Sequence, residues 1–301
     1  MGRQHRWGVL LYGFLLLLLS CSREEPAPIQ HADIKSIVPA DDRSLTPDEY
    51  LKMGMPSPDR MWSPLDYGQA SKVLKTLIDK DPCQLPRYES GRSGKMFDRI
   101  RSPENLAISQ DQNLQVETRM SLTFSYLENL SPILQIYLTE AEHGKNFDAE
   151  IVEIMGLMLE ISQKSQPLAA QFMASLPKDD PQLSVRQAGF EKTKAGTITI
   201  FTGAIDSLEE VHFYRVPARL RLCEHLGETL PEVMRNFPPS VQKELSIRLG
   251  KMSENELNVS VKEALARLCR EIDARESSHK AAIGGAESHS PSNDRNRSGA
   301  L

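Results

Sequence analysis

The sequence has few aromatic residues, few cysteines and no strong excess of either charge. Aromatic residues make up 6% of the chain, which is too few for a surface on which sugar rings stack to be expected. The 36 basic residues are outnumbered by 41 acidic residues, whereas a general nucleic-acid binder needs clustered lysine and arginine. We therefore expect no nucleic-acid partner.

Long apolar runs are also missing, because a membrane-spanning helix needs about 20 apolar residues and no run reaches that length. The longest run, residues 9–19, follows a basic start with Arg3 and Arg6, an order typical of a signal peptide. It ends in Leu18-Leu19-Ser20-Cys21, which resembles the lipobox of bacterial lipoproteins. The resemblance covers about the first 21 residues.

The lipobox resemblance implies that residues 1–20 are removed and that Cys21 carries a lipid. Two or three acyl chains would hold the protein on a membrane without any spanning helix, so we expect a bacterial cell-envelope protein in the periplasm or at the surface. Ser22 after the cysteine favours the outer over the inner membrane. The alternative is an ordinary secretory signal cut near Ser20 or Ser22, which needs no lipid.

Motifs that carry chemistry are absent from the sequence: there is no HExxH, GxSxG, dinucleotide fingerprint or EF-hand loop. We therefore expect no enzyme activity, no cofactor and no metal site. His225 and Glu228 share a helix face at a spacing that suits two metal ligands. Cys223 lies on another side of that helix, so we interpret His225 as a half-buried histidine in a charged face.

Composition divides the chain into four zones. After the signal, residues 21–60 are rich in proline, aspartate and serine, which predicts a flexible tether. Within it, Thr46-Pro47-Asp48-Glu49 has the cap, first-turn proline and acids of a short helix. Residues 61–275 have helical periodicity throughout, and residues 276–301 lack the large apolar groups needed to order a chain, so we expect a disordered tail there.

Breakers within the helical zone separate short amphipathic segments, which predicts an all-α fold. We expect an antiparallel multi-helix bundle or a HEAT-like stack of helix pairs. Residues 148–176 are apolar nearly all round and should form the central helix, and Pro132 should kink or split a long run over 104–143. The other expected helices cover residues 64–81, 96–102, 181–214, 217–236, 239–251 and 254–274.

Glycine recurs every seven residues at Gly189, Gly196 and Gly203. Glycine costs a helix roughly 1 kcal/mol relative to alanine, so a compensating contact is expected. We interpret the glycines as a packing seam that a neighbouring helix approaches closely, with a groove or an oligomer interface as alternatives. A strand over residues 197–200 is the alternative to helix here, because β-branched residues crowd there.

A basic loop precedes the short segment that contains Met96. Residues 90–95, Ser-Gly-Arg-Ser-Gly-Lys, have the wrong glycine spacing for a nucleotide-binding loop. Backbone amides and cations could still hold an anion there, and a solvated loop paired with acids is the other interpretation. The candidate anion-binding residues are Arg87, Arg92, Lys95 and Arg99.

Three cysteines remain after Cys21: Cys83, Cys223 and Cys269. None of them forms a CxxC pair, so a thioredoxin-like site is not expected. Either one pair forms a disulfide, or all three stay reduced; Cys223 and Cys269 lie in apolar helical stripes, where a buried cysteine packs as a small hydrophobe.

Two functions fit these observations. The first is a non-catalytic interaction or scaffold module, which the lipid holds near an envelope protein partner. The second is a helical lipoprotein that binds a lipid, a peptide or a small molecule.

Overall fold

The computed structural model describes residues 42–177, 179–209 and 215–287, with side chains described as far as residue 275. Its α-helices are α2 (Pro47–Lys52), α3 (Pro64–Ile78), α4 (Gly94–Ile100), α5 (Ala107–Gln110), α6 (Val116–Glu142), α7 (Asp148–Ser175), α8 (Leu183–Glu209), α9 (Val216–Val233), α10 (Pro239–Asn255) and α11 (Val259–Glu287). Short 3-10 helices, η1 (Pro82–Gln84), η2 (Pro103–Leu106) and η3 (Met234–Asn236), lie in the connections. These ranges contain no strand, so the expected all-α class is confirmed.

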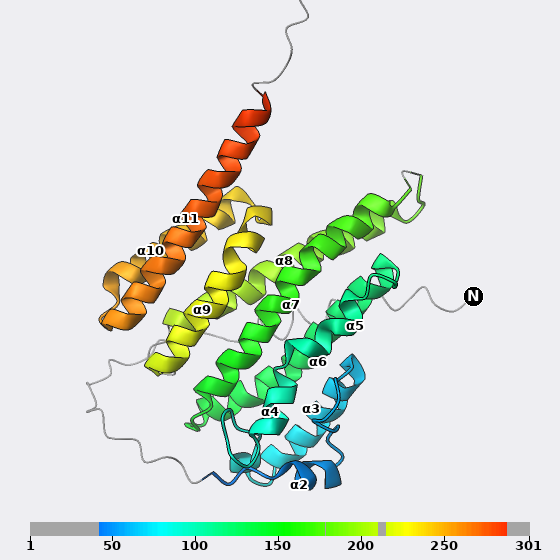
Figure 1. Ribbon diagram of the computed structural model, residues 1–301, viewed down its shortest axis with the longest axis vertical. Helices are drawn as coiled ribbons and strands as arrows, with labels where there is room; N and C mark the ends of the chain where they lie inside the picture. The colour runs from blue at the N-terminus through cyan, green and yellow to red at the C-terminus, as the bar shows by residue number, and fades with distance from the viewer. Residues whose placement is uncertain (1–41, 178, 210–214, 288–301) are drawn as a thin grey trace, which may run out of the picture.

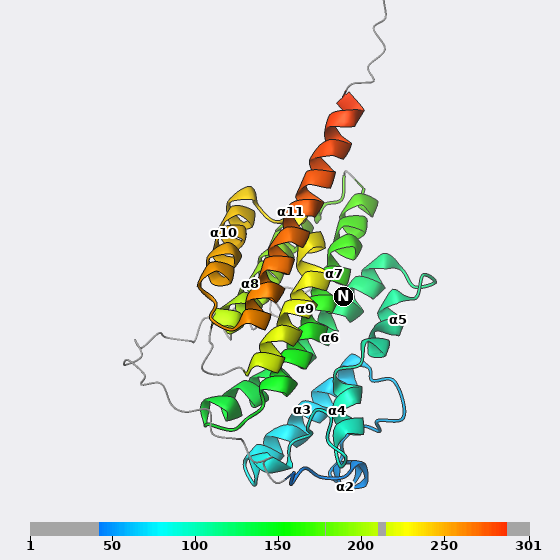
Figure 2. The ribbon, with the colours of Figure 1, turned by 60° about the vertical axis from the view of Figure 1, so that its left-hand side comes forward.

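The helices stack in two layers (Figures 1 and 2). In one layer α3, α6, α7, α9 and α11 lie side by side, each in contact with the next. Behind them, α8 packs against α7 and α9, and α10 packs against α11. Short connections join antiparallel neighbours such as α6 and α7, so the fold has the expected form of stacked antiparallel helix pairs.

The central helix is α7, as the sequence predicts. It contacts α6 on one side, α9 on the other and α8 behind. Apolar side chains point in every direction around it, and Val152, Ile154 and Leu159 are completely buried. A helix covered on three sides can bury its whole circumference, which is why its sequence lacks an extended polar face.

Residues 42–60 belong to the packed domain, so the expected tether is wrong over this stretch. Tyr50 of α2 is completely buried, and its hydroxyl donates to Gln84 O at 2.6 Å. The predicted cap of α2 is confirmed, since Thr46 and Glu49 form a capping box. The proline-rich composition predicts a flexible segment here. The side chains of Tyr50 and Met55 are nevertheless buried and anchor the segment in the core.

The start of α3 carries a local capping signal, and Pro132 lies inside a helix. Ser63 and Asp66 form a capping box around Pro64 at the start of α3. Pro132 lies inside α6 without splitting it, although residues 104–115 before it form η2, α5 and a turn rather than one long helix.

The segment with the β-branched cluster is helical, so the strand alternative for residues 197–200 is wrong. Thr197 Oγ1 donates to Thr193 O at 3.1 Å, and Thr199 Oγ1 donates to Ala195 O at 3.0 Å. These bonds to the preceding turn give the threonine hydroxyls partners within the helix. Phe201 and Ile205 on the same helix are completely buried, so tertiary packing outweighs the local strand preference.

Helix α11 extends to Glu287 and so includes residues 276–287 of the expected tail, whose side chains lie outside the described residues. Residues 288–301 of that tail, the signal segment and Cys21 lie outside the described residues. No helix in the described ranges is long and apolar enough to cross a membrane. The thiols of Cys83, Cys223 and Cys269 are free.

Candidate functional site

Two hollows adjoin on the same side of α7. The first, which we call the Glu153 hollow, has a volume of about 350 Å³ and lies between α7 and α9, with Arg101 and Pro103 at its edge. The second, the Arg119 hollow, has a volume of about 340 Å³ and lies between α7, α5 and the start of α6. Lys164 lines both. In Figure 1, α7 runs between α6 and α9.

A buried carboxylate lies at the floor of the first hollow. The Glu153 side chain is 4% exposed, and two arginines from different parts of the chain meet it. Arg101 Nη1 donates to its Oε2 at 2.7 Å, and Arg221 Nε donates to its Oε1 at 2.8 Å. Burial alone would raise the pKa of Glu153, but the neighbouring His225, Arg221 and Arg101 outweigh it and lower the pKa to about 2. Glu153 is therefore ionised and paired at neutral pH.

His225 lies against the backbone of α7 beside this carboxylate. It follows Arg221 by one turn of α9, so both side chains face α7. A Cβ at Gly156 would lie 2.4 Å from His225 Nε2, so only glycine allows the imidazole to rest there. The Nε2 atom is buried and 3.9 Å from Glu153 Oε1, and it has no hydrogen-bond partner in the described chain.

The Glu153 hollow can recognise polar groups. At the surface, Arg101 Nε also donates to Asp98 Oδ1 at 3.0 Å, and Arg221 Nη1 donates to Glu224 Oε2 at 2.9 Å. The Nη2 atom of each arginine has no hydrogen bond in the described residues. The two Nη2 groups are donors, and His225 Nε2 can donate or accept, so a bound polar group could pair with all three. A carboxylate with a pKa of about 2 is a weak general base at neutral pH, so this geometry favours binding over proton transfer.

The predicted anion-binding residues do not converge on one point. Arg87 lies over the Phe147 ring at 4.2 Å and faces Glu150 at 3.7 Å. The other three cations pair with three separate acids on different segments: Arg92 with Glu49 at 3.8 Å, Lys95 with Asp59 at 2.5 Å, and Arg99 with Glu104 at 3.4 Å. The arrangement matches the paired-loop interpretation more closely than a shared anion position.

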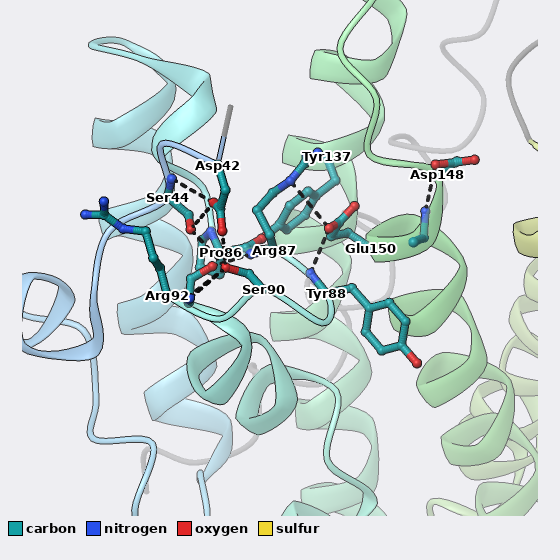
Figure 3. Close-up of polar contacts among 12 residues, drawn as sticks. Asp42, Ser44, Pro86, Arg87, Tyr88, Ser90, Arg92, Tyr137, Asp148 and Glu150 are labelled. Atoms are coloured by element: carbon teal, nitrogen blue, oxygen red, sulfur yellow. Dashed lines mark hydrogen bonds and ion pairs between the residues drawn. The ribbon is translucent and has the colours of Figure 1, made fainter. Parts of the chain in front are cut away.

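Backbone amides of this basic loop also have internal partners (Figure 3). Arg87 N donates to Ser93 Oγ at 2.8 Å, and Tyr88 N donates to Glu150 Oε1 at 2.7 Å. Ser90 Oγ accepts from Arg92 N at 3.0 Å and from Ser93 N at 3.1 Å. The loop therefore uses its N–H groups to hold its own shape and to dock on α7.

The same loop fastens the start of the described chain. Ser90 Oγ and Ser44 Oγ both donate to the carboxylate of Asp42, and the Ser44 amide donates to it at 3.1 Å (Figure 3). Burial raises the pKa of Asp42, but these hydrogen bonds outweigh it, so the net shift is downward. The first described residue is thus held in place beside the loop that precedes α4.

The predicted seam at Gly189, Gly196 and Gly203 is wrong for the described residues. A Cβ at any of the three would meet nothing within 4 Å, so no helix approaches them closely. Close contacts between helices occur instead at Gly156, between α7 and α9, and at Gly68, between α3 and α6. The heptad spacing indicated a common face, but it could not show whether another helix covers that face.

The sequence reasoning missed four residues of these hollows: Glu153, Arg101, Arg221 and Arg119. Glu153 had a visible signal, because it is a charged residue inside the apolar run from Ile151 to Leu159. A charge in such a position is buried and needs a partner. Arg119 carried no comparable signal. Cys223 and His225 lie in different environments, and the described residues contain no cluster of three or more groups that could hold a metal.

Comparison with known protein families, curated proteins and solved structures finds no match for this chain.

Proposed function

We propose that this protein is a lipid-anchored, non-catalytic interaction module of the bacterial envelope, which binds a polar segment of a protein partner at the Glu153 hollow. The observation that carries the proposal is the buried Nε2 atom of His225, which has no hydrogen-bond partner in the described residues and lies beside the partly exposed guanidinium groups of Arg101 and Arg221. A buried polar atom without a partner is costly, so a polar group that binds beside it gains a hydrogen bond.

The anchor restricts where the partner is. Twenty residues, 22–41, lie between Cys21 and the first described residue, and a fully extended chain of that length reaches at most about 70 Å. The domain therefore works within that distance of the lipid surface. This is a shorter reach than a tether ending at residue 60 would allow.

The chemistry of the hollow favours a polar partner of mixed charge. Its walls combine Arg101, Arg221 and Lys164 with Glu160 and Glu228, so neither a purely acidic nor a purely basic segment is preferred. The floor is already neutralised, because Glu153 is paired with two arginines. Recognition would then depend on hydrogen-bond geometry rather than on net charge.

The test is site-specific photo-crosslinking in the native cells, with the crosslinking residue at Glu228 on the exposed rim of the hollow. The matched control places it at Lys251, an exposed position on α10. We expect one envelope protein to be captured from position 228 and not from 251, and to be lost in Cys21→Ser. Equal capture from both positions, or none from 228, would contradict the proposal.

A separate measurement tests the anchor itself. Metabolic labelling with an alkyne analogue of palmitate should mark the wild-type protein and leave Cys21→Ser unlabelled. A wild-type protein that is secreted and unlabelled would instead favour the ordinary secretory signal.

A further inference from the structure

The geometry points to a second binding site: the Arg119 hollow takes the phosphate or carboxylate group of a small, freely diffusing organic anion. This site is independent of the partner proposed for the Glu153 hollow. Its central feature is a buried cation without an acidic partner.

Arg119 is 8% exposed, and no acidic side chain of the described chain lies within ion-pair distance of it. Its Nε donates to Ser109 O at 3.4 Å and its Nη1 donates to Gln112 Oε1 at 3.1 Å, and both acceptors are neutral. Arg219, buried to a similar degree, pairs with Glu256. A buried charge is normally paired, so Arg119 lacks the counter-charge that its position calls for.

The helix dipole adds positive potential around Arg119, and a second cation lines the hollow. Arg119 lies in the first turns of α6, where the helix dipole contributes further positive potential, and the helix has no side-chain cap at Gln115. Lys164 reaches the hollow from α7, and its ammonium lies 2.5 Å from Glu160, which does not line this hollow. The walls of the Arg119 hollow thus hold two cations and no acid.

The remaining walls suit a small organic anion. The side-chain amides of Gln112 and Gln171 line the hollow beside Arg119, whereas the hydroxyls of Ser109 and Thr123 donate to Leu106 O and Arg119 O at 2.8 Å. Arginine with neutral donors is the usual combination for binding phosphate or carboxylate oxygens. Pro167 and Leu168 supply an apolar wall for a carbon skeleton, and about 340 Å³ lies within the range of small-molecule pockets.

The first test is titration calorimetry of the purified full-length protein with inorganic phosphate and with acetate, at an ionic strength held constant with chloride. We expect one site per chain for at least one of these probes. Arg119→Met should weaken binding at least tenfold and Lys164→Gln severalfold. Arg235→Met, which removes an exposed arginine paired with Glu232, should leave it unchanged.

Thermal unfolding separates a binding role from a merely structural one. Without added anion, Arg119→Met should melt at or above the wild-type temperature, because it removes an unpaired buried charge. Phosphate or acetate should raise the melting temperature of the wild type and not of the variant. If Arg119→Met does not fold, Arg119→Lys keeps the charge but loses the guanidinium fork, and it should bind at least threefold more weakly.

Three results would overturn the inference. The first is that Arg119→Met, or Arg119→Lys where the methionine variant does not fold, binds the anion as tightly as the wild type. The second is that chloride stabilises the protein as much as phosphate and acetate do, and the third is that the protein binds only to vesicles containing phosphatidylglycerol. The last would assign the anion to a lipid headgroup instead of a free molecule. None of these results affects the crosslinking from position 228, so failure here is distinguishable from failure of the proposed function.

Discussion

Replacement of Glu153 by glutamine tests the charge network at the floor of the first hollow. Glutamine keeps the shape of the side chain and mimics its protonated form, but Arg101 and Arg221 lose their shared carboxylate. The pKa of Glu153 falls from 4.5 to about 2 on folding, which corresponds to about 3 kcal/mol of stability at neutral pH. Removal of one member of a buried ion pair costs a similar amount, about 3–5 kcal/mol.

The dependence on pH has a definite direction. Since the folded pKa lies below the unfolded one, the stabilisation is fully present above about pH 5 and disappears as the pH falls toward 2. We therefore expect Glu153→Gln to be about 3 kcal/mol less stable than the wild type at pH 7. That difference should fall to about half at pH 3.

Urea unfolding followed by circular dichroism measures both values, and thermal unfolding should show a loss of about 6–12 °C at pH 7. Glu160→Gln is the matched control on the same helix, because Glu160 is 31% exposed and pairs only with Lys164. The free energy of unfolding of Glu160→Gln should be less than about 1 kcal/mol below that of the wild type. A Glu153 variant within 1 kcal/mol of the wild type at pH 7, or a difference that does not change with pH, would refute the reasoning.

Gly156→Ala should destabilise the fold by about 1–3 kcal/mol in urea unfolding, because its Cβ would lie 2.4 Å from His225 Nε2. The same change at Gly196, where the space is open, should stabilise the fold by up to about 1 kcal/mol. Burial raises the pKa of Glu150, so the contribution of this residue to stability should fall as the pH rises from 4 to 7, and over that range the stability of Glu150→Gln relative to the wild type should increase. Cys223 should react with Ellman's reagent only after unfolding, since burial raises the pKa of its thiol to about 12.

Each of these expectations has a contrary outcome. Equal effects of alanine at positions 156 and 196 would mean that the contact with His225 does not limit the approach of α7 to α9. Parallel pH profiles for Glu150→Gln and the wild type would show that Glu150 does not titrate differently on folding. Rapid labelling of Cys223 in the native protein would contradict its burial between α9 and its neighbours.

Much of the fold could be predicted from the sequence because the responsible interactions are local. Thr46 and Ser63 cap their helices through residues three positions away, and a proline at the first helical position marks each start. The run around Ile154 is apolar in all directions, which only a central helix can tolerate. These features need no knowledge of any distant neighbour.

The candidate sites could not be predicted in the same way. Arg101 and Arg221 reach Glu153 from 52 and 68 residues away, so their meeting depends on how α4 and α9 stack on α7. The absence of an acid beside Arg119 is likewise a property of the packed helices and not of its sequence neighbours.

The sequence by itself determined the helical class, the starts of α2 and α3 and the central position of α7, since short-range capping and periodic burial decide them. Tertiary structure alone decided which glycine lies at a close helix contact. Gly156 and Gly196 both lie in helices, but only Gly156 faces a side chain of another helix. A helical period identifies a face, and only the packing of the whole chain shows what covers that face.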